Sequence, residues 1–186
     1  MCSFAGAAGV AQSNGDYNRA IAEFGAGRYA SAEALFARVE ASSPGATDAL
    51  LYRAKCLVHL PDFKSAEQAL RRYLDSGHGS ADALYMLGFV LNREDRPRES
   101  LAAYTRAAAL TPPASDDLKI VGLDYILLDD YPDAIQWLEK AVAFDDKNKD
   151  AWYYLGRAYY SKSRLGEARR AFEKVLEFDP RNSKAE

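Results

Sequence analysis

The chain repeats its pattern of small and apolar residues every 34 positions. Gly88, Gly122 and Gly156 stand 34 residues apart, and each follows a leucine or valine and precedes a leucine or tyrosine by three residues. The register holds without an insertion over five segments, which begin at Ser13, Thr47, Ala81, Ser115 and Lys149. An internal period of roughly 20–50 residues is typical of repeat architectures, so this period limits the fold more than any other feature of the sequence.

Each segment has the pattern of two helices. Counted from the first residue of the segment, mostly apolar or small residues fall at positions 4, 8 and 11 and again at positions 20, 24 and 27, which is the spacing of one helix face. In the last segment these residues are Trp152, Gly156, Tyr159, Ala168, Phe172 and Val175. Prolines at position 32 (Pro44, Pro112 and Pro180) disfavour continuation of the second helix. Because Val, Ile and Thr are sparse, composition also favours helices over strands, and the sequence predicts ten helices and no sheet.

The last segment reads W-x2-L-G-x2-Y, then A-x3-F, then P, between Trp152 and Pro180. This pattern resembles the tetratricopeptide repeat (TPR). The resemblance implies an all-α, right-handed superhelical solenoid of antiparallel helix pairs, with repeats at 13–46, 47–80, 81–114, 115–148 and 149–182. The first repeat departs from the pattern at Asp16 and Glu23, and the second has Arg53 where an apolar residue is usual.

The two ends of the chain fall outside the repeats, and we expect tails at residues 1–12 and 183–186. The first stretch, MCSFAGAAGVAQ, is small and apolar. It is either an unstructured start or a signal-peptide remnant, with Gly9 and Ala11 near a candidate cleavage point. We favour a cytoplasmic protein, with the periplasm or export as alternatives. No apolar run reaches the roughly 18 residues of a membrane span, so none is expected.

The TPR resemblance implies that the first helices line a concave groove that holds a peptide or a partner segment. Positions 2, 5, 9, 12 and 13 share one helix face. From these positions we predict a groove formed by Tyr17, Leu51, Lys55, His59, Tyr85, Phe89, Arg93, Lys119, Leu123, Tyr153, Arg157 and Tyr160. The alternative is that neighbouring first helices cover some of these side chains.

Aspartates recur at position 2, in the first turn of the first helices, where the helix dipole favours negative charge. They are Asp48, Asp82, Asp116 and Asp150. A ligand segment with apolar side chains and an acidic group suits the predicted groove better than a polyanion, which this row would repel. The total of 24 Lys and Arg against 27 Asp and Glu also argues against a nucleic-acid partner.

No motif predicts catalytic, cofactor or metal chemistry. GAGRYA, residues 25–30, fits G-x-G-x-x-A, but it joins two predicted helices instead of a strand and a helix. Cys56 and His59 form C-x-x-H without the further ligands that zinc needs. Cochaperone TPR domains hold a C-terminal carboxylate with a lysine and an asparagine at positions 5 and 9 of their first unit, where this chain has Tyr17 and Ile21.

The sequence therefore predicts a non-enzymatic scaffold that binds a protein segment. One alternative is a self-assembling or envelope-complex scaffold, including a homo-oligomer formed through an uncapped C-terminal repeat. Because no repeat follows the fifth in this sequence, we expect Phe178 to be exposed or covered by another copy of the chain. Another alternative is a regulatory TPR part of a larger enzyme or secretion machine.

Overall fold

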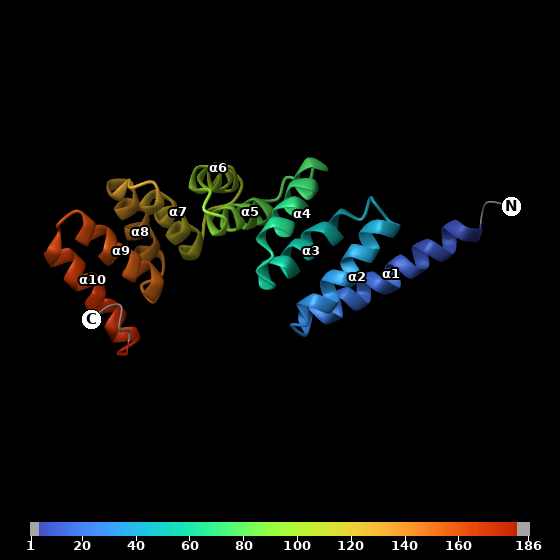
Figure 1. Cartoon of the computed structure of the whole chain (residues 1–186), viewed down its shortest axis with the longest axis horizontal. Coiled ribbons are helices and arrows are strands. Elements are labelled where there is room, and N and C mark those ends of the chain that lie inside the picture. The colour runs from blue at the N-terminus through green and yellow to red at the C-terminus, as the bar shows by residue number, and fades with distance from the viewer. Residues whose placement is uncertain (1–3, 182–186) are drawn as a thin grey trace. The chain divides into compact units, whose positions relative to one another are not determined.

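The computed structural model describes residues 4–181, with side chains from Asn14 onward. These residues form ten helices and no strand, which confirms the predicted all-α class (Figure 1). The helices are α1 (Phe4–Gly25), α2 (Tyr29–Ser42), α3 (Thr47–His59), α4 (Phe63–Asp75), α5 (Ala81–Arg93), α6 (Pro97–Ala108), α7 (Ser115–Leu127), α8 (Tyr131–Phe144), α9 (Lys149–Ser161) and α10 (Leu165–Phe178).

The chain divides within α5 into two compact units, Met1–Val90 and Leu91–Glu186. We call them the N-terminal and the C-terminal unit and describe each by itself. In the N-terminal unit α1 packs against α2, and α3 packs against both α2 and α4. In the C-terminal unit α7 packs on α8, and α9 packs on α8, on α10 and on α7. Each unit is thus a run of helical hairpins joined by short turns.

In four of the five hairpins the turn uses a left-handed backbone at position 15 of the repeat. Gly27 has a φ of +73°, and Asp95, Asp129 and Ser163 each have a φ of +58°. Glycine adopts this conformation without strain, whereas other residues adopt it at a cost. GAGRYA is therefore the turn between α1 and α2, as the sequence indicates.

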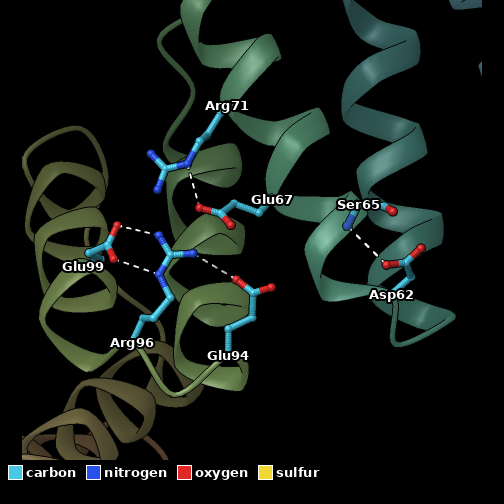
Figure 2. A network of polar contacts seen from close by, with 7 residues as sticks. All are labelled: Asp62, Ser65, Glu67, Arg71, Glu94, Arg96 and Glu99. Atoms are coloured by element: carbon cyan, nitrogen blue, oxygen red, sulfur yellow. Dashed lines mark hydrogen bonds and ion pairs between the residues drawn. The ribbon is translucent and has the colours of Figure 1, made fainter.

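The second helices begin in two different ways. Asp62 accepts a hydrogen bond from the backbone N–H of Ser65 at 3.2 Å, which caps α4. At the equivalent position before α6 stands Arg96, whose guanidinium instead donates to both carboxylate oxygens of Glu99, at 2.8 and 2.7 Å. Figure 2 shows both arrangements, and also Glu94, which pairs with Arg96 at 3.1 Å. Position 16 is therefore either a cap or one half of an ion pair in the first turn.

The small residue at position 8 sets how closely the two helices of a hairpin approach. A Cβ at Gly122 would lie 2.5 Å from Cγ of Leu138, and one at Gly156 would lie 2.7 Å from Cε1 of Phe172. These distances are shorter than van der Waals contact, so only glycine fits without a shift of the neighbour. The register predicted from the sequence is confirmed at both hairpins.

Arg53 interrupts the apolar pattern of α3, and α2 supplies its partners. The guanidinium lies 2.8 Å from a carboxylate oxygen of Glu33 and 2.9 Å from one of Glu40. Arg72 of α4 also pairs with Glu40. A charge at a packing position is thus tolerated because the neighbouring helix carries two carboxylates against it.

The first helix differs from the sequence-based boundary. α1 begins at Phe4 instead of Ser13, so residues 4–12 of the predicted tail 1–12 are helical. This segment is rich in alanine and has no proline, which favours extension of the helix. Its origin as a signal-peptide remnant stays a prediction, and the tail at 183–186 lies outside the described residues. No helix among the described residues has the length and apolarity needed to cross a membrane.

Candidate protein-binding face

We call the side of α1, α3, α5, α7 and α9 that carries positions 2, 5, 9, 12 and 13 the first-helix face. In the N-terminal unit, Tyr17 is largely used for packing. Its ring meets the rings of Phe36 and Tyr52 edge-on, with centroids 5.8 and 6.4 Å apart. Burial raises the pKa of the Tyr17 hydroxyl, with a smaller effect of Asp48. Tyr17 therefore packs against neighbouring helices instead of lying open on this face. This agrees with the alternative that neighbouring first helices cover some of the predicted groove residues.

His59 is exposed at the end of α3, and its ring is held by aromatic contacts. It stacks on Tyr29 with centroids 4.0 Å apart and planes at 5°, and Phe24 meets it edge-on at 6.3 Å. Tyr29 and Tyr52 escaped the sequence-based prediction because they lie at positions 17 and 6, outside the predicted face. Aromatic residues at these two positions are the signal that could have revealed the cluster.

Cations and aspartates of the first-helix face pair with each other across neighbouring repeats. Lys55 Nζ lies 2.8 Å from Asp82 Oδ2, and also 5.5 Å from the ring centroid of Tyr52. Lys119 Nζ lies 2.7 Å from Asp116 and 3.8 Å from Asp150. The hydrogen bond from Lys119 lowers the pKa of Asp116. The aspartate row is therefore partly neutralised by the lysines instead of standing as a bare negative stripe.

The remaining apolar residues predicted in the N-terminal unit are Leu51, Tyr85 and Phe89. All three are half-buried. The ring of Phe89 meets that of Phe63 edge-on, with centroids 6.2 Å apart. Each thus keeps part of its side chain accessible while helix contacts limit its rotation.

In the C-terminal unit the most open apolar side chains of this face are Leu127 and Tyr160, which are 49% and 66% exposed. Leu123, one turn earlier on α7, is half-buried. Arg157 is exposed and lies over the ring of Tyr153 at 6.0 Å. The predicted Arg93 is exposed at the end of α5. Since α7 and α9 are neighbours, Leu127 and Tyr160 belong to adjoining helices of one surface.

Tyr153 reaches towards the second helix of its repeat. Its ring lies 6.0 Å from that of Phe172 and 5.3 Å from that of Tyr154. It is half-buried, whereas Tyr160 on the same helix points into the open. Of the two tyrosines predicted for this helix, Tyr160 is the better placed for a ligand.

Asp124 is a buried acid that the sequence-based prediction missed. Its side chain is fully buried, and Asn92 donates to its Oδ1 from Nδ2 at 2.7 Å. Burial raises the pKa of Asp124 to about 6, while hydrogen bonds from Asn92 and Ser100 oppose the shift. Asn92 therefore points towards Asp124 of α7, although its position 12 belongs to the first-helix face.

Ser76 and Cys56 are two groups that could serve as nucleophiles, and neither is activated by its surroundings. Ser76 Oγ lies 2.9 Å from His78 Nδ1, but it also donates to the Tyr73 carbonyl at 2.6 Å. A hydroxyl whose proton goes to a carbonyl is not activated by the imidazole. Cys56 is buried, and burial raises the pKa of its thiol to about 11. Among the residues with described side chains, no group of three or more His, Cys, Asp or Glu could hold a metal ion.

Family models match both units. Models described as tetratricopeptide repeat match residues 17–81 and 149–182, and one described as TPR repeat matches residues 122–163. The chain belongs to the tetratricopeptide repeat family. The match at residues 149–182 covers the same residues as the last predicted repeat.

Curated relatives of this TPR protein are longer. It is 23% identical over 155 residues to Protein bimA of Emericella nidulans, covering 83% of this chain and 19% of bimA. It is 26% identical over 181 residues to the DnaJ protein P58IPK homolog of Arabidopsis thaliana, covering 90% of this chain and 37% of that protein. The chain thus spans well under half the length of either relative.

Two solved structures share the TPR fold. The crystal structure of MamA protein matches with a TM-score of 0.80 at 24% identity, covering 93% of this chain and 94% of MamA. A structure described as YrrB, a TPR protein with an unusual peptide-binding site, matches with a TM-score of 0.78 at 21% identity, covering 91% and 88% of the two chains. At these identities the likeness shows the fold.

Proposed function

We propose that this TPR protein is a non-enzymatic interaction scaffold that binds a peptide or partner segment on its first-helix face. The observation that carries the proposal is the pair of open apolar side chains on neighbouring helices, Leu127 on α7 and Tyr160 on α9. Exposed apolar groups gathered on one surface usually mark an interaction site. YrrB, a protein of the same fold, is described as having an unusual peptide-binding site, which supports peptide binding as a use of the fold.

The charges of the face favour a segment with apolar side chains and one acidic group. Arg157 is exposed beside Tyr160 on α9 and supplies a cation for such a group. Arginine and tyrosine are frequent anchors of protein interfaces because they bury a large area for little conformational entropy. Lys119 is already engaged by two aspartates, so it orders the face more than it attracts a ligand.

Selection of peptides from a displayed library by the full chain, followed by calorimetry, tests the proposal. The Leu127→Ala/Tyr160→Ala variant should bind the selected peptide about ten-fold or more weakly, which corresponds to about 1.4 kcal/mol. Leu110→Ala is the matched control, because Leu110 is 57% exposed and lies after α6. Equal affinity of both folded variants and the wild type would place the site elsewhere.

The N-terminal unit has its own test. A Tyr85→Ala/Phe89→Ala variant removes two half-buried side chains of α5. A loss of affinity in this variant, but not in the Leu127/Tyr160 variant, would locate the ligand on the N-terminal unit.

Self-assembly through the last repeat is a second candidate function. On α10, Leu165 is 60% exposed and Phe178 is 42% exposed, as predicted for Phe178. Leu165 also lines a cavity of about 470 Å³, together with Tyr160, Phe172 and Leu176, among others. Light scattering over a range of concentrations tests it. If the mass rises with concentration and Leu165→Glu abolishes the rise, a second copy covers this surface, whereas a constant monomer mass argues against it.

Two further functions considered from the sequence are also proposals. A part in an envelope complex, or a regulatory role within a larger enzyme or secretion machine, would employ the same first-helix face. The longer curated relatives are compatible with such a use.

A further inference from the structure

A second hollow lies in the C-terminal unit, on the opposite side of α9 from the first-helix face. We propose that this hollow, between α8 and α10, binds a partner segment that carries a bulky apolar side chain next to a lysine or arginine. The proposal does not depend on the first-helix face, because the two surfaces use different positions of α9.

The hollow has the size and lining of a side-chain pocket. Its volume is about 470 Å³, and its floor consists of Trp152, Leu155 and Tyr159 of α9. Val142 of α8 and Ala171 of α10 form apolar walls. The floor residues stand at positions 4, 7 and 11, which the sequence assigns to packing. Trp152 is only half-buried, so the helices do not close over it.

Hydrogen bonds hold the aromatic floor in place. Trp152 Nε1 donates to the carbonyl oxygen of Asp146 at 2.8 Å. Tyr159 donates from its hydroxyl to Glu139 Oε1 at 2.5 Å, and the guanidinium of Arg164 lies 4.5 Å from the tyrosine ring centroid. A floor fixed in this way loses little side-chain entropy when a ligand enters, which favours binding.

The rim of the pocket carries charges of both signs. It is lined by four carboxylates, Glu139, Glu167, Glu173 and Glu177, and by two cations, Arg170 and Lys174. The ion pairs of this rim are exposed, so they contribute little energy and are screened by salt. They join Glu173 to Arg169, Glu177 to Lys174 and Glu167 to Arg164.

Glu139 is the strongest anchor for a cation. Its hydrogen-bond donor is the neutral hydroxyl of Tyr159, which leaves the negative charge of the carboxylate uncompensated by that contact. A backbone hydrogen bond and then Arg164 lower the pKa of Glu167. Arg164 already lies over the ring of Tyr159, so a lysine or arginine of the partner would lie beside Glu139 and over the ring of Trp152, where it gains both charge and cation–π interactions. An acidic segment would meet repulsion from Glu139.

Trp152 can report binding directly. The chain has two tryptophans, so Trp137→Phe leaves Trp152 as the only one. The probe is the peptide acetyl-Gly-Leu-Arg-Leu-Gly-amide, titrated into the full chain that carries Trp137→Phe. Its comparators replace Arg with Glu, or both Leu with Ala. We expect a saturable change in Trp152 emission with the first peptide and about ten-fold weaker binding of each comparator.

Two variants in this background locate the effect. Glu139→Gln keeps an acceptor for Tyr159 but removes the charge, and should weaken the Arg peptide while leaving the Glu peptide equal or stronger. Leu127→Ala/Tyr160→Ala should change nothing, which separates this pocket from the proposed function. The proposal is overturned if the emission change does not saturate, if Arg and Glu peptides bind equally, or if the Leu127/Tyr160 variant loses binding.

Discussion

Asn92 at the end of α5 donates a hydrogen bond to Oδ1 of Asp124 on α7, one period further along the chain, at 2.7 Å. The acceptor is a carboxyl group that is fully buried. Burial penalises its charged form, and the two side-chain hydrogen bonds it accepts only partly compensate. The interface that this pair crosses should therefore respond to pH.

The first prediction concerns this pH response. The pKa of Asp124 is about 6 in the folded chain against an ordinary value of 3.8, so the folded state binds the proton more tightly than the unfolded state. The resulting stability is fully present below pH 3.8 and is lost as pH rises through 6. The two pKa values correspond to about 3 kcal/mol in full, of which about 1.4 kcal/mol falls between pH 7.5 and pH 5.

Urea unfolding of the wild type and of Asp124→Asn at these two pH values measures the effect. Asp124→Asn keeps a polar side chain between Asn92 and Ser100 and should lack this gain on acidification. Asp75→Asn, at an exposed position of α4, is the control for the change in net charge. Parallel pH profiles of wild type and Asp124→Asn would contradict the prediction.

A second prediction concerns the close approach of α9 and α10. Gly156→Ala should destabilise the chain by about 1–3 kcal/mol, because its Cβ would collide with the Phe172 ring. Gly166→Ala is the matched control, since a Cβ there meets nothing within 4 Å. It should be neutral or slightly stabilising. If thermal unfolding shows the same change for both variants, the contact is less tight than described.

The third prediction compares two leucines of the last hairpin. Leu155 is 2% exposed and Leu165 is 60% exposed. Leu155→Ala should cost about 2–5 kcal/mol, whereas Leu165→Ala should cost well under about 1 kcal/mol. Because repeat contacts are mostly between neighbours, hydrogen exchange should show the loss concentrated in α9 and α10. An unmoved melting curve for Leu155→Ala would refute the register.

The fourth prediction concerns the left-handed turn at position 15. Gly27 has a φ of +73°, so Gly27→Ala should cost about 1 kcal/mol. Gly27→Asn should cost less, since asparagine tolerates this conformation better than alanine. Denaturant midpoints of the two variants provide the comparison, and a smaller loss for alanine would speak against a left-handed turn.

The period predicted the helices and their packing faces because position 8 and position 24 must meet in every hairpin. It could not predict which face residues would be covered, because that depends on the neighbouring repeat. Tyr17 is covered by Tyr52, and Lys55 is paired with Asp82, each through a contact between repeats. Asp124 was missed since an acid at a packing position has no signature of its own until its partner Asn92 is seen beside it.

The hollow above Trp152 could not be predicted from the sequence, for a different reason. Positions 4 and 11 specify large side chains that point towards the second helices, but not how closely those helices meet. The same aromatic residues can be covered by the second helices or left accessible between them. The positions of α8 and α10 in the structure show that they are left accessible.

Two hydrogen bonds that cross between repeats span nearly one period, with separations of 32 residues for Asn92 to Asp124 and 33 for Asn148 to Ser115. Such contacts close only short loops as the chain folds, and topologies of this kind fold quickly. They also make the number of repeats adjustable during evolution. Insertion of a whole period would keep the packing faces of the flanking helices in register, so the scaffold can be lengthened without a change in how its hairpins stack.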